Sequence, residues 1–169
     1  NKDKVILWST GNDSMLGNEG KIISDFNDIL HQYLQKPPII LIRKNPLSKV
    51  DYKFLAKKFE NIRICNNYWI KNNVLDFLYL TEKGEIEWKT LLNITDLIIS
   101  VPSTVVLEAS LNKIKVFNFI FNSSNEIVEK LYHYTQSDLY KPLIQSNHCV
   151  IETDINNLAN NVINFINSG

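Results

Sequence analysis

The chain has 169 residues, of which 44% are hydrophobic and 21% are charged, so we expect one compact domain over residues 1–169. The 18 basic residues equal the 18 acidic ones, which argues against a nucleic-acid-binding surface. No apolar stretch reaches the roughly 20 residues of a membrane span, and the first residues lack the layout of a signal peptide. Cys65 and Cys149 stand far apart, without the paired spacing of a disulfide framework or a zinc site. The sequence therefore predicts a cytoplasmic protein without a membrane span or a metal site.

Short apolar runs alternate with segments of helical spacing along the chain. We expect strands at residues 5–8, 39–42, 62–65, 97–99, 116–120 and 149–151. Helical stripes fall at residues 22–34 and 50–59, around residues 88–92, and at residues 155–166 behind an Asp154 cap. Most of the strands are continuously apolar, as in parallel sheets covered on both faces. This alternation predicts an α/β fold: a doubly wound, Rossmann-like parallel sheet of about six strands with helices on both faces.

Residues 66–84 and 134–147 show no clear helical or strand pattern, and we assign them no element. Tyr68 and Trp69 lie in the first of these segments. Adjacent aromatic side chains there can stack on a nucleobase, although packing or loop cover is the simpler interpretation. The spacing of the early glycines does not match a dinucleotide-binding fingerprint.

Polar residues follow three of the predicted strands, at residues 9–14, 43–46 and 100–104. Because the carboxyl ends of parallel strands meet at one edge of the sheet, we expect these residues to face one cleft. Pro102 ends its strand and forces a turn. Ser103 or Thr104 then caps a new helix whose first amides suit an anion, with Glu108 one turn further on. Ser and Thr are also ordinary helix caps, and an early Glu suits the helix dipole without any ligand.

The stretch "ITDLIISVPSTVVLEASLNKIKVFNF", residues 94–119, resembles the donor-binding core of GT-B glycosyltransferases of bacterial surface-carbohydrate and capsule synthesis. The order of predicted strands and helices, with "LIRKNP" after the second strand, resembles their C-terminal lobe over the rest of the chain. Similar layouts occur in CDP-glycerol glycerophosphotransferases and nucleotide-sugar epimerases. The resemblance implies one lobe of a larger two-lobe enzyme that transfers a sugar in the synthesis of a surface polysaccharide or glycolipid.

This resemblance also implies roles for individual residues. The backbone amides at Ser103 and Thr104, after Pro102, would hold the diphosphate, and Glu108 the ribose hydroxyls. Ser9, Thr10 and Gly11 would lie near the phosphates, and Arg43 or Lys44 would add positive charge. A helix terminus and a cation would stabilise the leaving nucleoside phosphate, so no metal or other cofactor is expected. The donor would be a UDP-linked sugar, in preference to a CDP- or CMP-linked one.

The acceptor, a glycan or a lipid-linked glycan, would be brought by a missing N-terminal lobe or a partner chain, which could hold the protein at the inner membrane face. No catalytic base is assigned, because His31, His133 and His148 show no defined partner. Lys44-Asn45-Pro46 lacks the His of the glycerophosphotransferase pattern, which makes glycerophosphate transfer the weaker alternative. A further alternative is a non-catalytic nucleotide-binding module or a donor subunit that depends on a partner.

Overall fold

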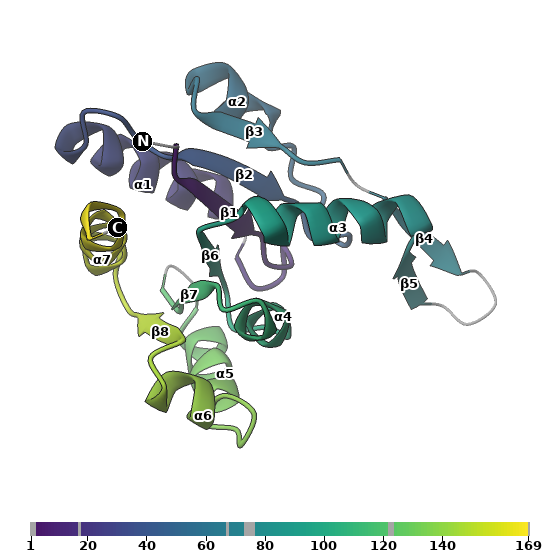
Figure 1. Cartoon of the computed structure of the whole chain (residues 1–169). Helices are drawn as coiled ribbons and strands as arrows, with labels where there is room; N and C mark the ends of the chain where they lie inside the picture. The colour runs from purple at the N-terminus through teal and green to yellow at the C-terminus, as the bar shows by residue number, and fades with distance from the viewer. Residues whose placement is uncertain (1–2, 17, 67, 73–76, 122–123, 169) are drawn as a thin grey trace.

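The computed structural model describes residues 3–16, 18–66, 68–72, 77–121 and 124–168. Its main sheet has six parallel strands in the order β3-β2-β1-β6-β7-β8 (Figure 1). These strands are β1 (Val5–Ser9), β2 (Ile39–Arg43), β3 (Ile62–Ile64), β6 (Leu97–Ser100), β7 (Lys115–Phe119) and β8 (Cys149–Glu152). The prediction of a Rossmann-like parallel sheet is confirmed, and every predicted strand matches an observed one to within a residue at each end. The strand order reverses between β1 and β6.

Helices cover both faces of this sheet. α1 (Glu19–Tyr33), α2 (Lys53–Lys58) and α7 (Ile155–Asn167) contribute to one buried cluster. α3 (Glu82–Ile94), α4 (Val105–Leu111) and α6 (Lys141–Gln145), together with Tyr140 directly before it, contribute to the other. The remaining helix is α5 (Asn125–Thr135). As predicted, the Asp154 side chain caps α7, where it accepts hydrogen bonds from the amides of Asn156 and Asn157.

Strand β1 lies at the centre of the molecule, and all five of its residues are buried. Its side chains alternate between the two faces: Trp8 packs with the helices α1 and α7, whereas Leu7 packs with α3 and α4. The Trp8 ring lies 5.4 Å from the ring centres of both Phe26 and Phe119. Burial on both faces explains why the strands read as continuous apolar runs.

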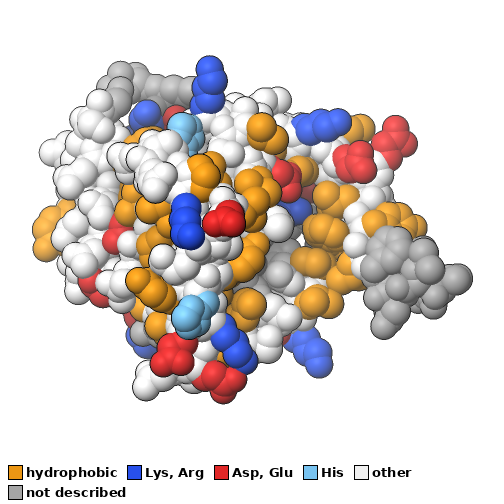
Figure 2. All heavy atoms as spheres, turned by 90° about the horizontal axis from the view of Figure 1, so that it is seen from below, with side chains coloured by type: hydrophobic (Ala, Val, Ile, Leu, Met, Phe, Trp, Pro, Cys, Tyr) orange, Lys and Arg blue, Asp and Glu red, His pale blue; other side chains and the backbone are white. Residues whose placement is uncertain are grey.

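The first unassigned segment contains an antiparallel hairpin, formed by β4 (Trp69–Asn72) and β5 (Phe77–Leu80). The hairpin projects from the body of the molecule beside the start of α3 (Figure 1). In Figure 2, hydrophobic side chains are exposed on the right of the molecule, the side on which the hairpin lies. Ile70 and Tyr79, which pair across the hairpin, are 46% and 43% exposed. The second unassigned segment contains the end of α5 and the five residues of α6.

Candidate functional site

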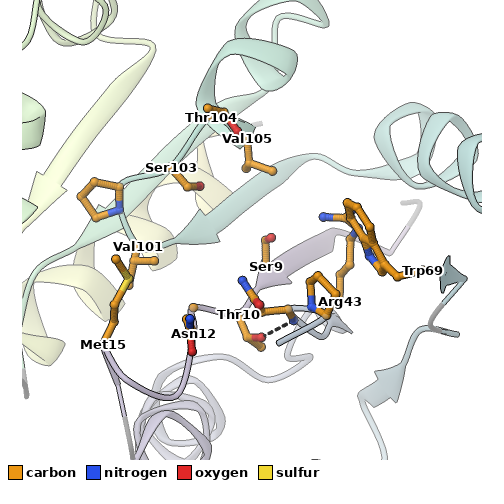
Figure 3. Close-up of a pocket in the computed structure, with 14 residues that line it drawn as sticks. Ser9, Thr10, Asn12, Met15, Arg43, Trp69, Val101, Ser103, Thr104 and Val105 are labelled. Atoms are coloured by element: carbon orange, nitrogen blue, oxygen red, sulfur yellow. Dashed lines mark hydrogen bonds between the residues drawn. The ribbon is translucent and has the colours of Figure 1, made fainter. Parts of the chain in front are cut away.

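A pocket of about 360 Å³ lies at the carboxyl ends of β1, β2 and β6, where the strand order reverses. Figure 3 shows Ser103, Thr104 and Val105 on one side of it, and Thr10, Arg43 and Trp69 on the other. Ligands of open α/β sheets bind in this position. The connections that follow the neighbouring strands β1 and β6 run in opposite directions, so a crevice opens between them. The lining residues are Ser9, Thr10, Gly11, Asn12, Met15, Arg43, Asn45, Pro46, Trp69, Val101, Pro102, Ser103, Thr104 and Val105.

The structure brings all the sequence-predicted site residues to this pocket except Lys44 and Glu108. Lys44 is half-buried beyond the end of β2 and interacts electrostatically with Asp13. Glu108 lies on α4, where its carboxylate accepts a hydrogen bond from the indole of Trp88. The carboxylate also interacts electrostatically with Arg43, which does line the pocket. Glu108 therefore acts on the pocket through Arg43.

The turn after β6 is held by two residues that sequence reasoning missed. Asn118, fully buried on β7, donates through its side-chain amide to the Ser100 carbonyl at 3.0 Å and hydroxyl at 2.9 Å, and to the Val101 carbonyl at 3.3 Å. The Tyr140 hydroxyl donates to the Ser103 carbonyl at 2.8 Å and accepts from the Ser103 amide at 2.6 Å. An Asn inside an apolar strand was the available signal for the first residue. Tyr140 lies 37 residues from its partner, and no local pattern marks it.

The prediction that Ser103 or Thr104 caps a new helix is confirmed in position, because Thr104 is the N-cap residue of α4, but the expected side-chain hydrogen bond is not formed. α4 begins at Val105, and Thr104, at the N-cap position, makes no side-chain cap hydrogen bond. The Ser103 amide is taken by Tyr140. Among the described residues, none accepts a hydrogen bond from the amides of Thr104 or Val105. Two backbone donors at the pocket wall thus stay open, on a helix of only seven residues whose dipole contributes little.

The loop after β1 is fixed by a buried carboxylate at the start of α1. Glu19, 1% exposed, accepts a hydrogen bond from the Trp8 indole at 2.8 Å and from the Gly11 amide at 2.9 Å. Burial raises the pKa of Glu19 to about 7, although hydrogen bonds from Trp8, Gly11 and Tyr52 oppose the rise. The Glu19 carboxylate thus pairs with the backbone amide of Gly11, a residue that lines the pocket. The Gly11 amide is therefore paired within the protein.

Gly11 and Thr10 join this loop to its neighbours. A side chain at position 11 would meet Val101 at 3.3 Å, so glycine allows the loop to approach the end of β6 closely. The Thr10 hydroxyl accepts a hydrogen bond from the Asn45 amide at 2.8 Å. The Thr10 amide donates to the Arg43 carbonyl at 3.0 Å. These contacts join three sides of the pocket into one framework.

Arg43, the last residue of β2, supplies the positive charge of the pocket. Its guanidinium carbon lies 4.1 Å from the ring centre of Trp88 and 5.6 Å from that of Trp69. Burial lowers the pKa of Arg43, while Glu108 and other acidic groups nearby oppose this. An arginine side chain nevertheless keeps its charge in proteins. The guanidinium is thus a cation held close to two aromatic rings.

The histidines lie elsewhere. His31 on α1 is exposed and stacks on Phe59, with the ring centres 6.0 Å apart. His133 lies in the last turn of α5, and His148 directly precedes β8. No His, Asp or Glu is found among the described residues that line the pocket. Over the described parts of the chain, no cluster of three or more His, Cys, Asp or Glu side chains could hold a metal ion.

Both cysteines are free thiols, as expected from their spacing. None of the helices in the described ranges combines the length and apolarity needed to cross a membrane. No protein-family model matches the chain. No curated protein matches it significantly in sequence. The pocket and the sheet topology are therefore the observations from which a function is inferred.

Proposed function

We propose that this chain is the nucleotide-sugar-binding domain of a GT-B glycosyltransferase. The observation that carries the proposal is the pocket at the reversal of the strand order, with Arg43 on one wall and the Ser103–Thr104 turn on the other. The resemblance of residues 94–119 to the donor-binding core of such enzymes points to the same turn. In this proposal a sugar is transferred to a glycan or lipid-linked acceptor in the synthesis of a surface polysaccharide or glycolipid.

The diphosphate would lie between the guanidinium of Arg43 and the open amides of Thr104 and Val105. Negative charge grows on the nucleoside phosphate as the bond to the sugar breaks. A fixed cation and fixed backbone donors stabilise that charge without having to reorganise during the reaction. The proposed transfer therefore uses no metal ion, and the UDP-linked donor is preferred to CDP- or CMP-linked ones. Glu108 does not line the pocket, so it would act on the bound ligand through its electrostatic interaction with Arg43.

A second candidate is a donor subunit that does not catalyse transfer by itself. The observation in its favour is that the described residues lining the pocket include no His, Asp or Glu that could act as a base. A second lobe of the same polypeptide, or a partner chain, would then bring both the base and the acceptor. In either case we place the reaction in the cytoplasm, with the acceptor-binding part at the inner membrane face.

A thermal unfolding experiment with nucleotides tests the proposal. UDP at about 100 times its Kd stabilises the fold by about 2.7 kcal/mol, which raises the Tm of a chain of this size by about 5–10 °C. We expect smaller shifts with CDP and CMP. Thr104→Glu should abolish the UDP shift, because its carboxylate would lie beside the phosphates. The absence of a shift with every nucleotide would reject the proposal.

Two further variants complete the experiment. Thr90→Glu adds the same charge on an exposed position of α3, away from the pocket, and should keep the UDP shift. Glu108→Ala should reduce the shift, and Glu108→Gln should reduce it less, because glutamine still accepts the Trp88 hydrogen bond. An equal loss in Thr90→Glu would show that added negative charge, and not its position, weakens binding.

A further inference from the structure

We infer that Trp69 forms the wall on which the nucleobase of the ligand stacks; this inference rests on the proposed function. Trp69 lines the pocket on the side of Arg43, facing the Ser103–Val105 wall (Figure 3). It belongs to the β4–β5 hairpin, which lies outside the six-stranded sheet. The hairpin would thereby add specificity for a nucleoside to a pocket that otherwise recognises phosphate.

The position of Trp69 is set by the base of the hairpin. Trp69 pairs with Leu80, and the Thr81 amide donates to the Tyr68 carbonyl at 3.0 Å. The Thr81 side chain then caps α3 by accepting a hydrogen bond from the Gly84 amide at 3.1 Å. A side chain at position 84 would come within 2.8 Å of Tyr68, so glycine allows the hairpin to pack directly on the first turn of α3. Trp69 is therefore held by hydrogen bonds and close packing at the root of the hairpin.

The surroundings of Trp69 suit a flat aromatic ligand attached to an anion. The Arg43 guanidinium lies near its ring and is backed by Trp88 on α3. A phosphate bound by Arg43 would thus place the attached nucleoside next to Trp69. The opposite wall carries the apolar residues Val101, Pro102 and Val105. A base between Trp69 and this wall would bury both of its faces, which favours stacking over hydrogen bonding as the source of affinity.

The hairpin itself offers a matched control. Successive side chains of a strand point to opposite faces, so Tyr79, which neighbours Leu80, lies on the face away from Trp69. Leu80, which shares a face of the hairpin with Trp69, packs against the buried cluster that contains Trp88. This face of the hairpin is therefore turned toward the body of the protein. Trp69→Leu and Tyr79→Leu each remove one aromatic ring from the same hairpin. They differ in whether that ring lines the pocket.

Titration calorimetry with UDP and with inorganic pyrophosphate tests the inference. We expect Trp69→Leu to weaken UDP binding about 10-fold, since stacking of a base on an aromatic side chain is worth about 5- to 150-fold in affinity. Pyrophosphate binding should stay within about twofold of the wild type. Trp69→Phe should recover most of the UDP affinity, and Tyr79→Leu should leave both affinities unchanged. Circular dichroism checks that each variant is folded.

The other outcomes are separable. Wild-type UDP affinity in Trp69→Leu would overturn the inference and leave the proposed function standing. An equal loss of UDP and pyrophosphate binding would also overturn it, because Trp69 would then act by positioning Arg43. A wild-type protein that binds neither ligand would reject the proposed function and the inference with it.

Discussion

Replacing Glu19 by glutamine should remove a pH dependence of stability that the wild-type protein possesses. The Glu19 carboxyl is buried, and its pKa rises from 4.5 to about 7 on folding, chiefly through desolvation. Between these two pH values the folded protein binds more protons than the unfolded chain. The stability contributed by the neutral carboxyl is therefore complete below about pH 4.5 and is lost as the pH rises through about 7.

The size of the effect follows from the same two values. The difference between 4.5 and about 7 corresponds to about 3 kcal/mol, at about 1.4 kcal/mol per pH unit. For a chain of this length, this amounts to a change in Tm of about 6–12 °C. Asp13 adds a small repulsion that also favours the neutral form of Glu19, and Tyr52 donates a hydrogen bond that favours the charged one.

Urea unfolding at pH values from 5 to 8 measures the difference. The free energy of unfolding of the wild type should fall by about 2.5 kcal/mol more than that of Glu19→Gln over this range, because a small part of the effect lies outside it. Only the slope against pH is compared, because glutamine cannot accept hydrogen bonds from both Trp8 and Gly11 and so changes the absolute stability. Glu60→Gln, at an exposed position, should keep the wild-type slope. Parallel curves for the wild type and Glu19→Gln would refute the reasoning.

Two other substitutions test how the turn after β6 is held. Asn118→Ala should lower the free energy of unfolding by about 1–3 kcal/mol, because buried oxygens at the end of β6 lose their donor; in urea unfolding, the exposed Asn164→Ala should remain near the wild type. Tyr140→Phe should cost about 1–2 kcal/mol by leaving the Ser103 amide and carbonyl without this partner, while Tyr134→Phe should cost less. Equal stabilities of Tyr140→Phe and the wild type would show that water replaces the hydroxyl at no cost.

The sheet could be predicted from sequence because its strands are covered on both faces. Continuous apolar runs such as residues 97–99 have no other stable environment in a chain of this kind. The hairpin escaped prediction because β4 and β5 are four residues each and lie outside the sheet, so their side chains follow no long apolar pattern. α6 escaped because it is only five residues long, which is too short to show a helical apolar pattern.

In the candidate site, too, the place of some residues could be predicted from the sequence and the place of others could not. Ser9 ends a strand, and Thr10 and Ser103 follow strands, so their place at one edge of the sheet follows from the parallel topology alone. The residues that hold the turn at Ser103 could not be predicted in this way, because Asn118 and Tyr140 reach this turn from elements later in the chain. The open amides of the pocket also depend on the Thr104 side chain, which lies at the predicted N-cap position of α4 but makes no cap hydrogen bond.

The hydrogen bonds between Tyr140 and Ser103 have a consequence for synthesis on the ribosome. The other walls of the pocket come from residues before 106, yet the turn that carries Ser103 gains its last anchor only when residue 140 has left the exit tunnel. A nascent chain that ends before this residue can hold Ser100 and Val101 through Asn118, but it leaves the backbone of Ser103 without its Tyr140 partner. Ligand binding should therefore mature late, after most of the sheet has assembled.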